Sequence, residues 1–450
     1  MESIITEIAG QFIHRIAEII TEGGTLTEIE GAALREAKAC AARLMETYAA
    51  EVDASMLADR AARREAGYSV ERRGDERRLQ TEVGEVRYQR TYFQKASGGY
   101  EYLTDTVLGV DKRERVSESL SLSLVGKAKD MSYSKASAHL TGGEISRQTV
   151  MRKVRGSYAQ GSLPGSRRWV PELHVEADEA HVTLRNGRKS EVPLISVHEG
   201  IVTEGNRHRC KNVFHISEYG KSPDDLWEQA LTEVEARYEL EGTKIYLHGD
   251  GASWIQKGLE WFPGAIFVLD KYHKNKAIKN MTAGLIQAER KLVDTAIRES
   301  LAMENTTLFN QLAQYLCDTL PPRCKQVLDG ARYLKKHIAG ISICAKDPSA
   351  NNGGCTEPHV SHVLSARLSS RPMAWSERTL TQLAPMLAGG NIRKTLPTHP
   401  SLPVPLQSAA ASARKTFYNR TLGLPVPDAI GTLPLSGKIT GTQKLLKLFA

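Results

Sequence analysis

Hydrophobic residues recur every three to four positions at the start of the chain, from Ile5 to Ile20. This spacing predicts an amphipathic helix, which Gly23 and Gly24 interrupt before a second helix from about Glu28 to Ala62. We expect this helical region, residues 1–66, either to self-associate or to pack onto a later domain.

From Tyr68 the pattern changes to an alternation of apolar and charged residues around "VGE" at 83–85. Alternation on both sides of a short glycine turn predicts a β-hairpin. One side of it is basic, and this side is either a surface for a polyanion or an ordinary solvated sheet face. The arginines concerned are Arg73, Arg77, Arg78, Arg87 and Arg90.

Residues 112–157 return to helical spacing and contain two short helices, "SYSKASAHL" and "SRQTVMRKV", joined by "TGGEI". Ser146 is a good N-cap for the second helix. Two helices with a glycine turn are typical of a helix-turn-helix, although such pairs also occur in proteins that do not bind DNA. The second helix would present Arg147, Gln148 and Thr149 to base edges, and Arg152, Lys153 and Arg155 to phosphates.

After a linker rich in Gly, Ser and Pro at 156–169, the pattern predicts strands at 172–184, 191–198 and about 209–218. A helix capped by Ser222 follows, then a strand that ends on Asp250. A short helix at 255–261 leads to another strand, which ends on Asp270. A three-strand meander followed by β-α units predicts a mixed α/β sheet.

Carboxylates stand at the positions where such a sheet forms sites, the carboxyl ends of its parallel strands. Asp250 and Asp270 follow strands directly, and Asp178 lies within the first strand on the same face as Glu176. Converging carboxylates repel and favour hard cations such as Mg²⁺ or Mn²⁺. The alternative for Asp250 alone is a simple Asp-Gly turn. We expect its flanking glycines to leave room for a metal and a phosphate.

Composition and charge narrow the class of protein. The chain has 450 residues, a net charge of +8 and a pI near 9.0, which favours a polyanionic partner. It has neither a long apolar run nor a basic-then-apolar start, so we expect a cytoplasmic protein that does not enter a membrane. None of the six cysteines forms a C-x-x-C pair, which favours reduced thiols.

Three motifs resemble those of the DDE transposases of bacterial insertion sequences, in particular the ISLre group and its Mutator-like relatives. They are "EADE" with Asp178, "HGDGA" with Asp250, and "LDKYH" with Asp270 and His273. A longer stretch, "GCTEPHVSHVLSARLSSRPMAW", adds Glu357. The resemblance implies an RNase H-like fold with an all-α insertion. It also implies that Asp178, Asp250 and Glu357 are the catalytic residues and the ligands of Mg²⁺ (or Mn²⁺), with two ions.

Residues around this triad have less certain roles. Asp270 is a rival for the third ligand because Pro358 adjoins Glu357, and His273 either contacts DNA or is a solvated histidine. His359 is a further auxiliary candidate, and we expect it and His362 to touch DNA and not to bind metal. Arg367 and Arg371 are candidates for phosphate contacts.

The sequence therefore divides into six regions, which run from the helical start to a Pro-rich basic tail that we expect to be extended. They are 1–66, helical; 67–158, hairpin plus helix-turn-helix; 170–274, catalytic core, first part; 275–350, α-helical insertion; 351–385, catalytic core, second part; and 386–450, tail.

We expect a transposase that binds the terminal inverted repeats of its element and target DNA. It would cleave and join strands in one site, as a homodimer or higher oligomer in the bacterial cytosol, associated with the nucleoid. Two alternatives stay open: an RNase H-like nuclease that only hydrolyses, and a non-catalytic DNA-binding regulator derived from a transposase.

Overall fold

The computed structural model describes residues 4–160, 166–205, 207–394 and 402–422, which form two compact units. Unit 1 comprises residues 1–120 together with 396–450, and unit 2 comprises residues 121–395. The junction near residue 120 lies between the β-hairpin and the predicted helix-turn-helix, inside the predicted region 67–158.

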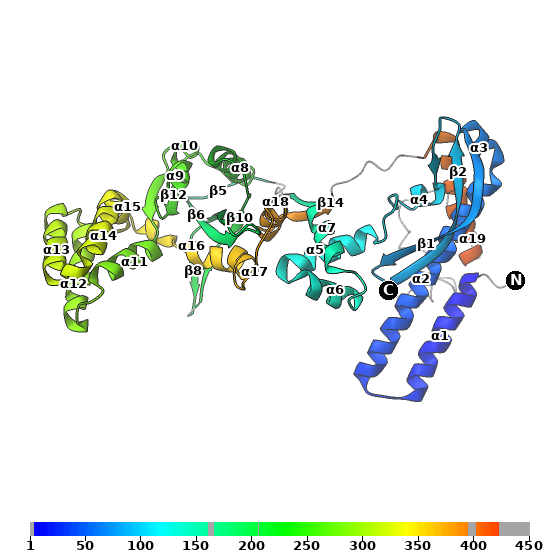
Figure 1. Ribbon diagram of the computed structural model, residues 1–450, viewed down its shortest axis with the longest axis horizontal. Helices are drawn as coiled ribbons and strands as arrows, with labels where there is room; N and C mark the ends of the chain where they lie inside the picture. Colours follow the sequence, from blue (N-terminus) through cyan, green and yellow to red (C-terminus); the bar gives the residue numbers. More distant parts are fainter. Residues whose placement is uncertain (1–3, 161–165, 206, 395–401, 423–450) are drawn as a thin grey trace. The chain divides into compact units, whose positions relative to one another are not determined.

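Unit 1 combines a long helical hairpin with a small antiparallel sheet (Figure 1). Thr25 begins the second helix with a capping box, in which its hydroxyl and the side chain of Glu28 satisfy each other's backbone N–H groups. The apolar side of the sheet packs on the helices around Met56 and Phe93. The elements are α1 (Ile4–Glu22), α2 (Leu26–Ala58), α3 (Arg60–Glu65), β1 (Tyr68–Thr81), β2 (Gly84–Lys95), β3 (Tyr100–Glu101), α4 (Leu103–Val107) and α19 (Val404–Leu422).

Helix α19 corrects the expectation that the whole tail is extended. Leu406, Ala409, Ala410 and Ala413 are buried, and the Ser55 hydroxyl donates to the Ala409 carbonyl at 2.8 Å. An alanine-rich run can therefore stay helical once one face is covered. The rest of the predicted tail beyond Leu422 lies outside the described residues.

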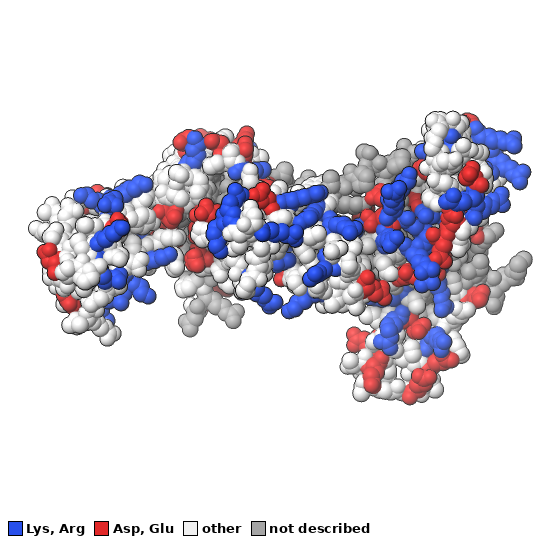
Figure 2. All heavy atoms as spheres, viewed as in Figure 1, with Lys and Arg blue, Asp and Glu red and all other residues white. Residues whose placement is uncertain are grey.

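Charges of both signs are interleaved over β1 and β2 (Figure 2). Arg72 pairs with Asp75 at 2.8 Å, Arg78 with Glu76 at 2.5 Å, and Arg87 with Glu85. Arg77 and Arg90 are buried, and Arg90 pairs with buried Asp105. The predicted basic side of the hairpin is therefore largely neutralised by its own acids.

The first part of unit 2 contains the two short helices and the glycine turn predicted from the sequence. Ser146 caps α7 through a bond from the Thr149 N–H at 3.2 Å, and Gly142 and Gly143 both have positive φ in the turn. Arg155 anchors α7 to α18 by bonds to Ser376 at 2.8 Å and Thr379 at 3.0 Å. The elements are α5 (Glu118–Asp130), α6 (Tyr133–Thr141), α7 (Arg147–Arg155), β4 (Ser157–Gln160), α18 (Glu377–Leu387) and β14 (Asn391–Lys394).

The centre of unit 2 is a five-stranded sheet in the order β10-β7-β6-β12-β13, counted over the described residues. Strands β10, β7 and β6 are antiparallel, whereas β6, β12 and β13 are parallel. This is the predicted meander with β-α units, a mixed α/β arrangement. The strands are β6 (Glu172–Thr183), β7 (Lys189–His198), β10 (Phe214–Ile216), β12 (Lys244–Gly249) and β13 (Ile266–Leu269). An unpredicted arm, β8 (Ile201–Glu204) with β9 (Arg207–Cys210), precedes β10.

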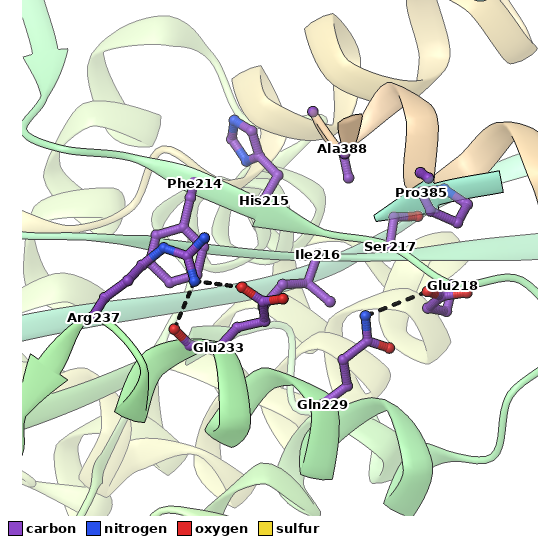
Figure 3. Close-up of a pocket in the computed structure, with 13 residues that line it drawn as sticks. Phe214, His215, Ile216, Ser217, Glu218, Gln229, Glu233, Arg237, Pro385 and Ala388 are labelled. Carbon is purple, nitrogen blue, oxygen red and sulfur yellow. Dashed lines mark hydrogen bonds and ion pairs between the residues drawn. The ribbon is translucent and has the colours of Figure 1, made fainter. Parts of the chain in front are cut away.

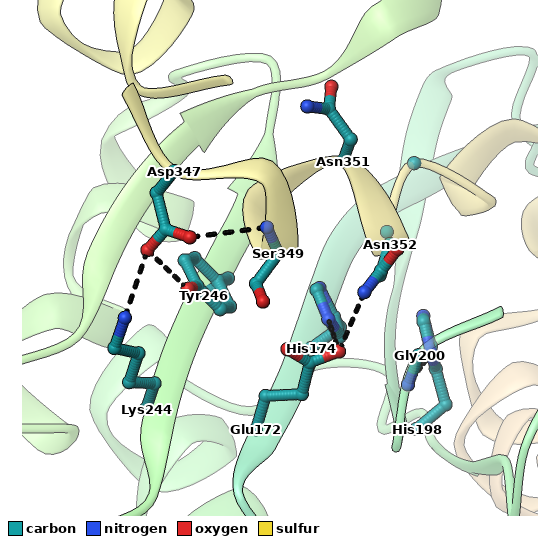
Figure 4. A network of polar contacts seen from close by, with 12 residues as sticks. Glu172, His174, His198, Gly200, Lys244, Tyr246, Asp347, Ser349, Asn351 and Asn352 are labelled. Carbon is teal, nitrogen blue, oxygen red and sulfur yellow. Dashed lines mark hydrogen bonds and ion pairs between the residues drawn. The ribbon is translucent and has the colours of Figure 1, made fainter. Parts of the chain in front are cut away.

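The two faces of this sheet differ in chemistry. One face is apolar and packs on α8 (Pro223–Glu235), α9 (Ser253–Gln256) and α10 (Gly258–Trp261), around the buried Trp227. The other carries His174, Glu176, His198 and His248, all at most 1% exposed. A short helix, η2 (Pro348–Asn352), covers part of this polar face: Asp347, which precedes it, accepts from Tyr246, and its Asn352 donates to Glu172 (Figure 4).

Between β13 and η2 in the sequence, the chain forms a group of helices, as predicted for residues 275–350 (Figure 1). It packs around its own core, which includes Ile297, Phe309 and Leu334. A disulfide joins Cys317 and Cys324 there, so the expectation that all thiols are reduced does not hold in this structure. The helices are α11 (Lys271–Thr282), α12 (Gln287–Ala302), α13 (Thr306–Thr319), α14 (Cys324–Lys336) and α15 (Ile338–Lys346). No helix in the described part of the chain is long and apolar enough to cross a membrane.

Candidate functional site

Strand register brings three aspartates to one level at one edge of the sheet. His248 pairs with Glu176, which places Asp250 opposite Asp178 two residues further on. Gly249 pairs with Leu269, which places Asp270 beside Asp250. The Asp270 N–H also donates to the Gly249 carbonyl at 2.9 Å, which continues this pairing past the last strand residues. Neighbours in parallel register point to the same face, so the three carboxylates share one side of the sheet.

Asp178 and Asp250 interact electrostatically within this cluster. Burial raises the pKa of Asp178 to about 6, and the charges of Glu179 and Asp250 contribute to the rise. Asp250 forms a tight turn, with its Oδ1 accepting from the Ala252 N–H at 2.8 Å. The charge of Asp250 thus disfavours the ionised form of the Asp178 carboxyl.

Asp270 and His273 form a pair at the start of α11. Asp270 Oδ1 caps the helix by accepting from the N–H groups of Tyr272 at 2.8 Å and His273 at 3.1 Å. The same oxygen lies 3.2 Å from His273 Nδ1, and this contact raises the pKa of His273, with Asp178 contributing. Asp270 is 1% exposed, and its Oδ2 has no hydrogen-bond partner. His273 therefore belongs to the acidic cluster and is not simply a solvated histidine.

The helical insertion contacts the cluster through α14, a link that the sequence did not reveal. The Tyr333 hydroxyl donates to the Asp250 carbonyl at 2.7 Å. Burial raises the pKa of Tyr333, and the charges of Asp250 and Asp270 add to it. A hollow between α11 and α14 adjoins this point and is lined in part by His273, Lys276, Arg323 and Tyr333.

The glycines beside Asp250 serve packing, which corrects our expectation that they leave room for ligands. A Cβ at Gly249 would lie 2.6 Å from the Ile255 side chain. A Cβ at Gly251 would overlap the His337 ring, and Gly251 has a φ of +88°. Both glycines therefore let the sheet end meet α9 and the helical insertion closely.

Glu357, the third predicted ligand, lies on a helix and not on the sheet that carries the aspartates. It is exposed on α16 (Thr356–His359), a short helix that packs against β6. No three His, Cys, Asp or Glu side chains in the described ranges are arranged to hold a metal ion. The structure thus brings Asp178 and Asp250 together with Asp270 and His273, and leaves Glu357 beside the strand that carries Asp178.

The predicted DNA-binding residues fall into two groups. Arg147, Gln148 and Arg152 are exposed along α7, Thr149 and Lys153 are half-buried there, and Arg371 is exposed. Arg367, in contrast, is buried: its Nε donates to the Ala128 carbonyl at 3.1 Å, and its guanidinium lies 4.8 Å from the Trp375 ring centre. Burial lowers the pKa of Arg367. Arg367 therefore fastens α17 (Ala366–Leu368) to α5 instead of facing a phosphate.

Glu176 is the centre of a second polar cluster, two residues before Asp178. Its Oε1 accepts from the Gly354 N–H at 2.5 Å and the Cys355 N–H at 3.0 Å, and it lies 3.1 Å from His198 Nε2. Burial alone would raise the pKa of Glu176, but the contacts with His198 and His359 bring it well below its usual value. Sequence reasoning noted Glu176 only as a neighbour of Asp178.

These features define the class: a mixed α/β protein with an acidic cluster at the carboxyl ends of its parallel strands. The model of the uncharacterised protein family UPF0236 matches residues 19–394, and the chain belongs to this family. A UPF0236 protein of Caldanaerobacter subterraneus subsp. tengcongensis is 32% identical over 402 residues, covering 87% of this chain and 83% of that protein. A UPF0236 protein of Streptococcus gallolyticus is 25% identical over 272 residues, covering 57% and 60%.

Proposed function

We propose that the chain is a DDE-type DNA transposase whose catalytic domain has an RNase H-like sheet. The observation that carries the proposal is the common level of Asp178, Asp250 and Asp270 on three neighbouring parallel strands. Sites in such sheets form at this edge. The strand order, with a three-stranded meander followed by two parallel strands and a helical insertion, supports the fold assignment.

The names of the relatives support a mobile element. One UPF0236 protein of Caldanaerobacter subterraneus, 31% identical to this chain, carries a name that joins eleven locus designations, and another joins four. One protein encoded at many places in a genome is the expected result of an element that copies itself. A nuclease or a regulator with a fixed role does not require such repetition.

The acidic cluster fits Mg²⁺ or Mn²⁺. Magnesium is usually held by one or two carboxylates together with water and substrate phosphates, so a cage of three protein ligands is not needed before DNA binds. Asp178 and Asp250 would hold the ion, and Asp270 has a buried, unpartnered oxygen beside them. Glu357 would join from α16 when DNA is present. When bound, two such ions would activate the attacking water or hydroxyl and stabilise the leaving oxygen.

The chain's own residues would position the DNA. His273, held by Asp270, would donate a hydrogen bond to a phosphate oxygen at the cluster, and its raised pKa favours the protonated ring that does so. Lys276 and Arg323 line the adjoining hollow and would bind the flanking backbone. The exposed end of α7, with Arg147 and Gln148, would read the element ends.

The test uses labelled DNA from the flanks of the encoding gene, incubated with the purified chain and Mn²⁺. We expect nicking at the element ends and joined products, both lost in Asp250→Asn and retained in the matched control Asp318→Asn on α13. Nicks without joined products would favour the nuclease. Specific binding that is indifferent to Mn²⁺ and to Asp250→Asn, without cleavage, would favour the regulator.

A further inference from the structure

A group of two cysteines and two histidines lies on the polar face of the sheet, away from the aspartates. Cys210 ends β9 and His215 lies on β10, with four residues between them. Cys355 precedes α16 and His359 ends it, with three residues between them. Two Cys-His pairs from distant parts of the chain thus meet, and thiolate with imidazole is the ligand set that Zn²⁺ prefers.

The like side chains of the two pairs are neighbours. Cys210 and Cys355 are half-buried free thiols, close enough for each to shift the pKa of the other. On one tetrahedral zinc ion their sulfurs would lie about 3.8 Å apart, because each Zn–S bond is about 2.3 Å long. The ring centres of His215 and His359 are 5.1 Å apart.

Both imidazoles are oriented as zinc ligands usually are. His215 Nδ1 lies 2.9 Å from the Ser196 hydroxyl, and His359 Nδ1 lies 3.5 Å from Glu176 Oε2. A hydroxyl or carboxylate at one ring nitrogen fixes the ring and directs the other nitrogen, here Nε2, to the metal. Figure 3 shows the His215 ring on the side of β10 opposite Phe214, so it points away from the apolar core.

Polar atoms without a full hydrogen bond gather at the same place. Glu176 Oε2 and His359 Nδ1 face each other at 3.5 Å, which is too long for a hydrogen bond, and Thr356 Oγ1 is buried without a partner. Incompletely satisfied buried groups are costly. A cation on Nε2 of His359 would strengthen the attraction between that ring and the Glu176 carboxylate.

We propose that Cys210, His215, Cys355 and His359 form a structural Zn²⁺ site, with Glu176 and Ser196 orienting the two imidazoles. This replaces the expectation that His359 does not bind metal. In the arrangement described, no three of these donor groups are placed to hold a metal. The two contacting pairs would converge by side-chain rotation when the ion binds. The site would tie the β8–β9 arm and β10 to α16 and so fix the helix that carries Glu357. It does not depend on the proposed function.

The experiment measures metal in the purified full-length chain after loading with Zn²⁺ and desalting. We expect about one tightly held zinc ion per chain. Replacement by Co²⁺ should give the visible bands of a tetrahedral site and a thiolate-to-cobalt charge-transfer band, both measured on the unaltered protein. Alkylation followed by peptide mass spectrometry should find Cys210 and Cys355 protected until a chelator is added, whereas Cys40 and Cys344 react equally in both conditions.

Variants then locate the site. Cys355→Ser and His359→Gln should lose the bound zinc, whereas Cys40→Ser and Cys344→Ser should retain it. Asp178→Asn and Asp250→Asn should also retain it, which separates this site from the acidic cluster. The proposal is overturned if no stoichiometric zinc is retained, if Cys210 and Cys355 alkylate equally fast with and without zinc, or if they are joined as a disulfide in the zinc-treated chain.

Discussion

The two faces of the central sheet are built from alternate residues of the same strands, and one buries apolar side chains whereas the other buries polar ones. On the apolar face, Leu173, Val175 and Leu247 pack without directional constraint against Trp227. On the polar face, His174 and Glu176 are buried equally deeply, yet each polar atom there needs its own partner. Packing on the apolar face fixes the positions of the strands. The fixed strands in turn hold the buried His and Glu side chains of the polar face in place.

The polar face does not satisfy all of its groups. His174 Nε2 and Glu176 Oε2 have no hydrogen-bond partner, and such an atom costs about 1–3 kcal/mol. Burial and the neighbouring histidines lower the pKa of His174 to about 2, so its ring stays neutral. The polar face therefore carries unsatisfied groups that lower the stability of the folded chain.

The largest expected effect is on the apolar face. Trp227→Ala removes a side chain that is 0% exposed and whose indole N–H donates to the Trp254 carbonyl at 2.7 Å. We expect a loss of about 3–5 kcal/mol in the free energy of unfolding, measured by urea denaturation. Trp169→Ala, at a tryptophan that is 55% exposed, is the control. An equal loss in both variants would contradict the assignment of Trp227 to the main core.

A smaller effect of opposite sign is expected at the edge of the polar face. The pKa of Asp178 is about 6 in the folded chain and ordinarily 3.8, so folding favours its protonated form. Its contribution to stability is present below about pH 4 and is lost as the pH rises through 6. With a chelator present, Asp178→Asn should therefore gain up to roughly 3 kcal/mol above pH 6 relative to the unaltered chain, and nothing below pH 4.

The measurement for Asp178→Asn is urea denaturation at a series of pH values. Asp318→Asn, at an exposed position, should change stability by less than about 0.5 kcal/mol at every pH. A gain that does not vary with pH would show that Asp178 is not held in a repulsive, desolvated cluster.

The smallest expected effect tests the contact between the polar face and the segment that begins η2. Tyr246→Phe keeps the ring that stacks on His174, with centres 5.1 Å apart, and removes the hydroxyl that donates to Asp347 at 2.7 Å. We expect a loss of about 1 kcal/mol in the free energy of unfolding, measured by urea denaturation. A double-mutant cycle with Asp347→Asn should show coupling of similar size; its absence would mean that η2 is held on the sheet by other contacts.

Much of the fold could be predicted because local patterns were strong. Alternation marked β6 and β7, Ser146 and Ser222 marked helix starts, and the positions of Asp250 and Asp270 after apolar runs indicated one edge of a sheet. These signals lie within a few residues of the features they predict. The common level of the three aspartates then follows from strand pairing.

Other features depended on contacts between distant residues. The sequence predicts Arg367 as a surface arginine. In the structure it is enclosed by Trp375 and the Ala128 carbonyl, which come from distant segments. The proximity of Cys210 and Cys355 could not be predicted, because 144 residues separate them in the sequence. Helix α19 was missed because its alanines acquire a reason to be helical only when α2 covers them.

Helix α19 also sets an order of events during synthesis. Leu406, Ala409 and Ala413 complete the interior of unit 1, but they leave the ribosome after every strand of unit 2. Unit 1 must therefore wait, with Met56 and Phe93 incompletely covered, while unit 2 emerges and folds between its two parts. A ribosome that stops within unit 2 would release a chain whose first 120 residues still expose apolar surface, which makes that product a target for chaperones and proteases.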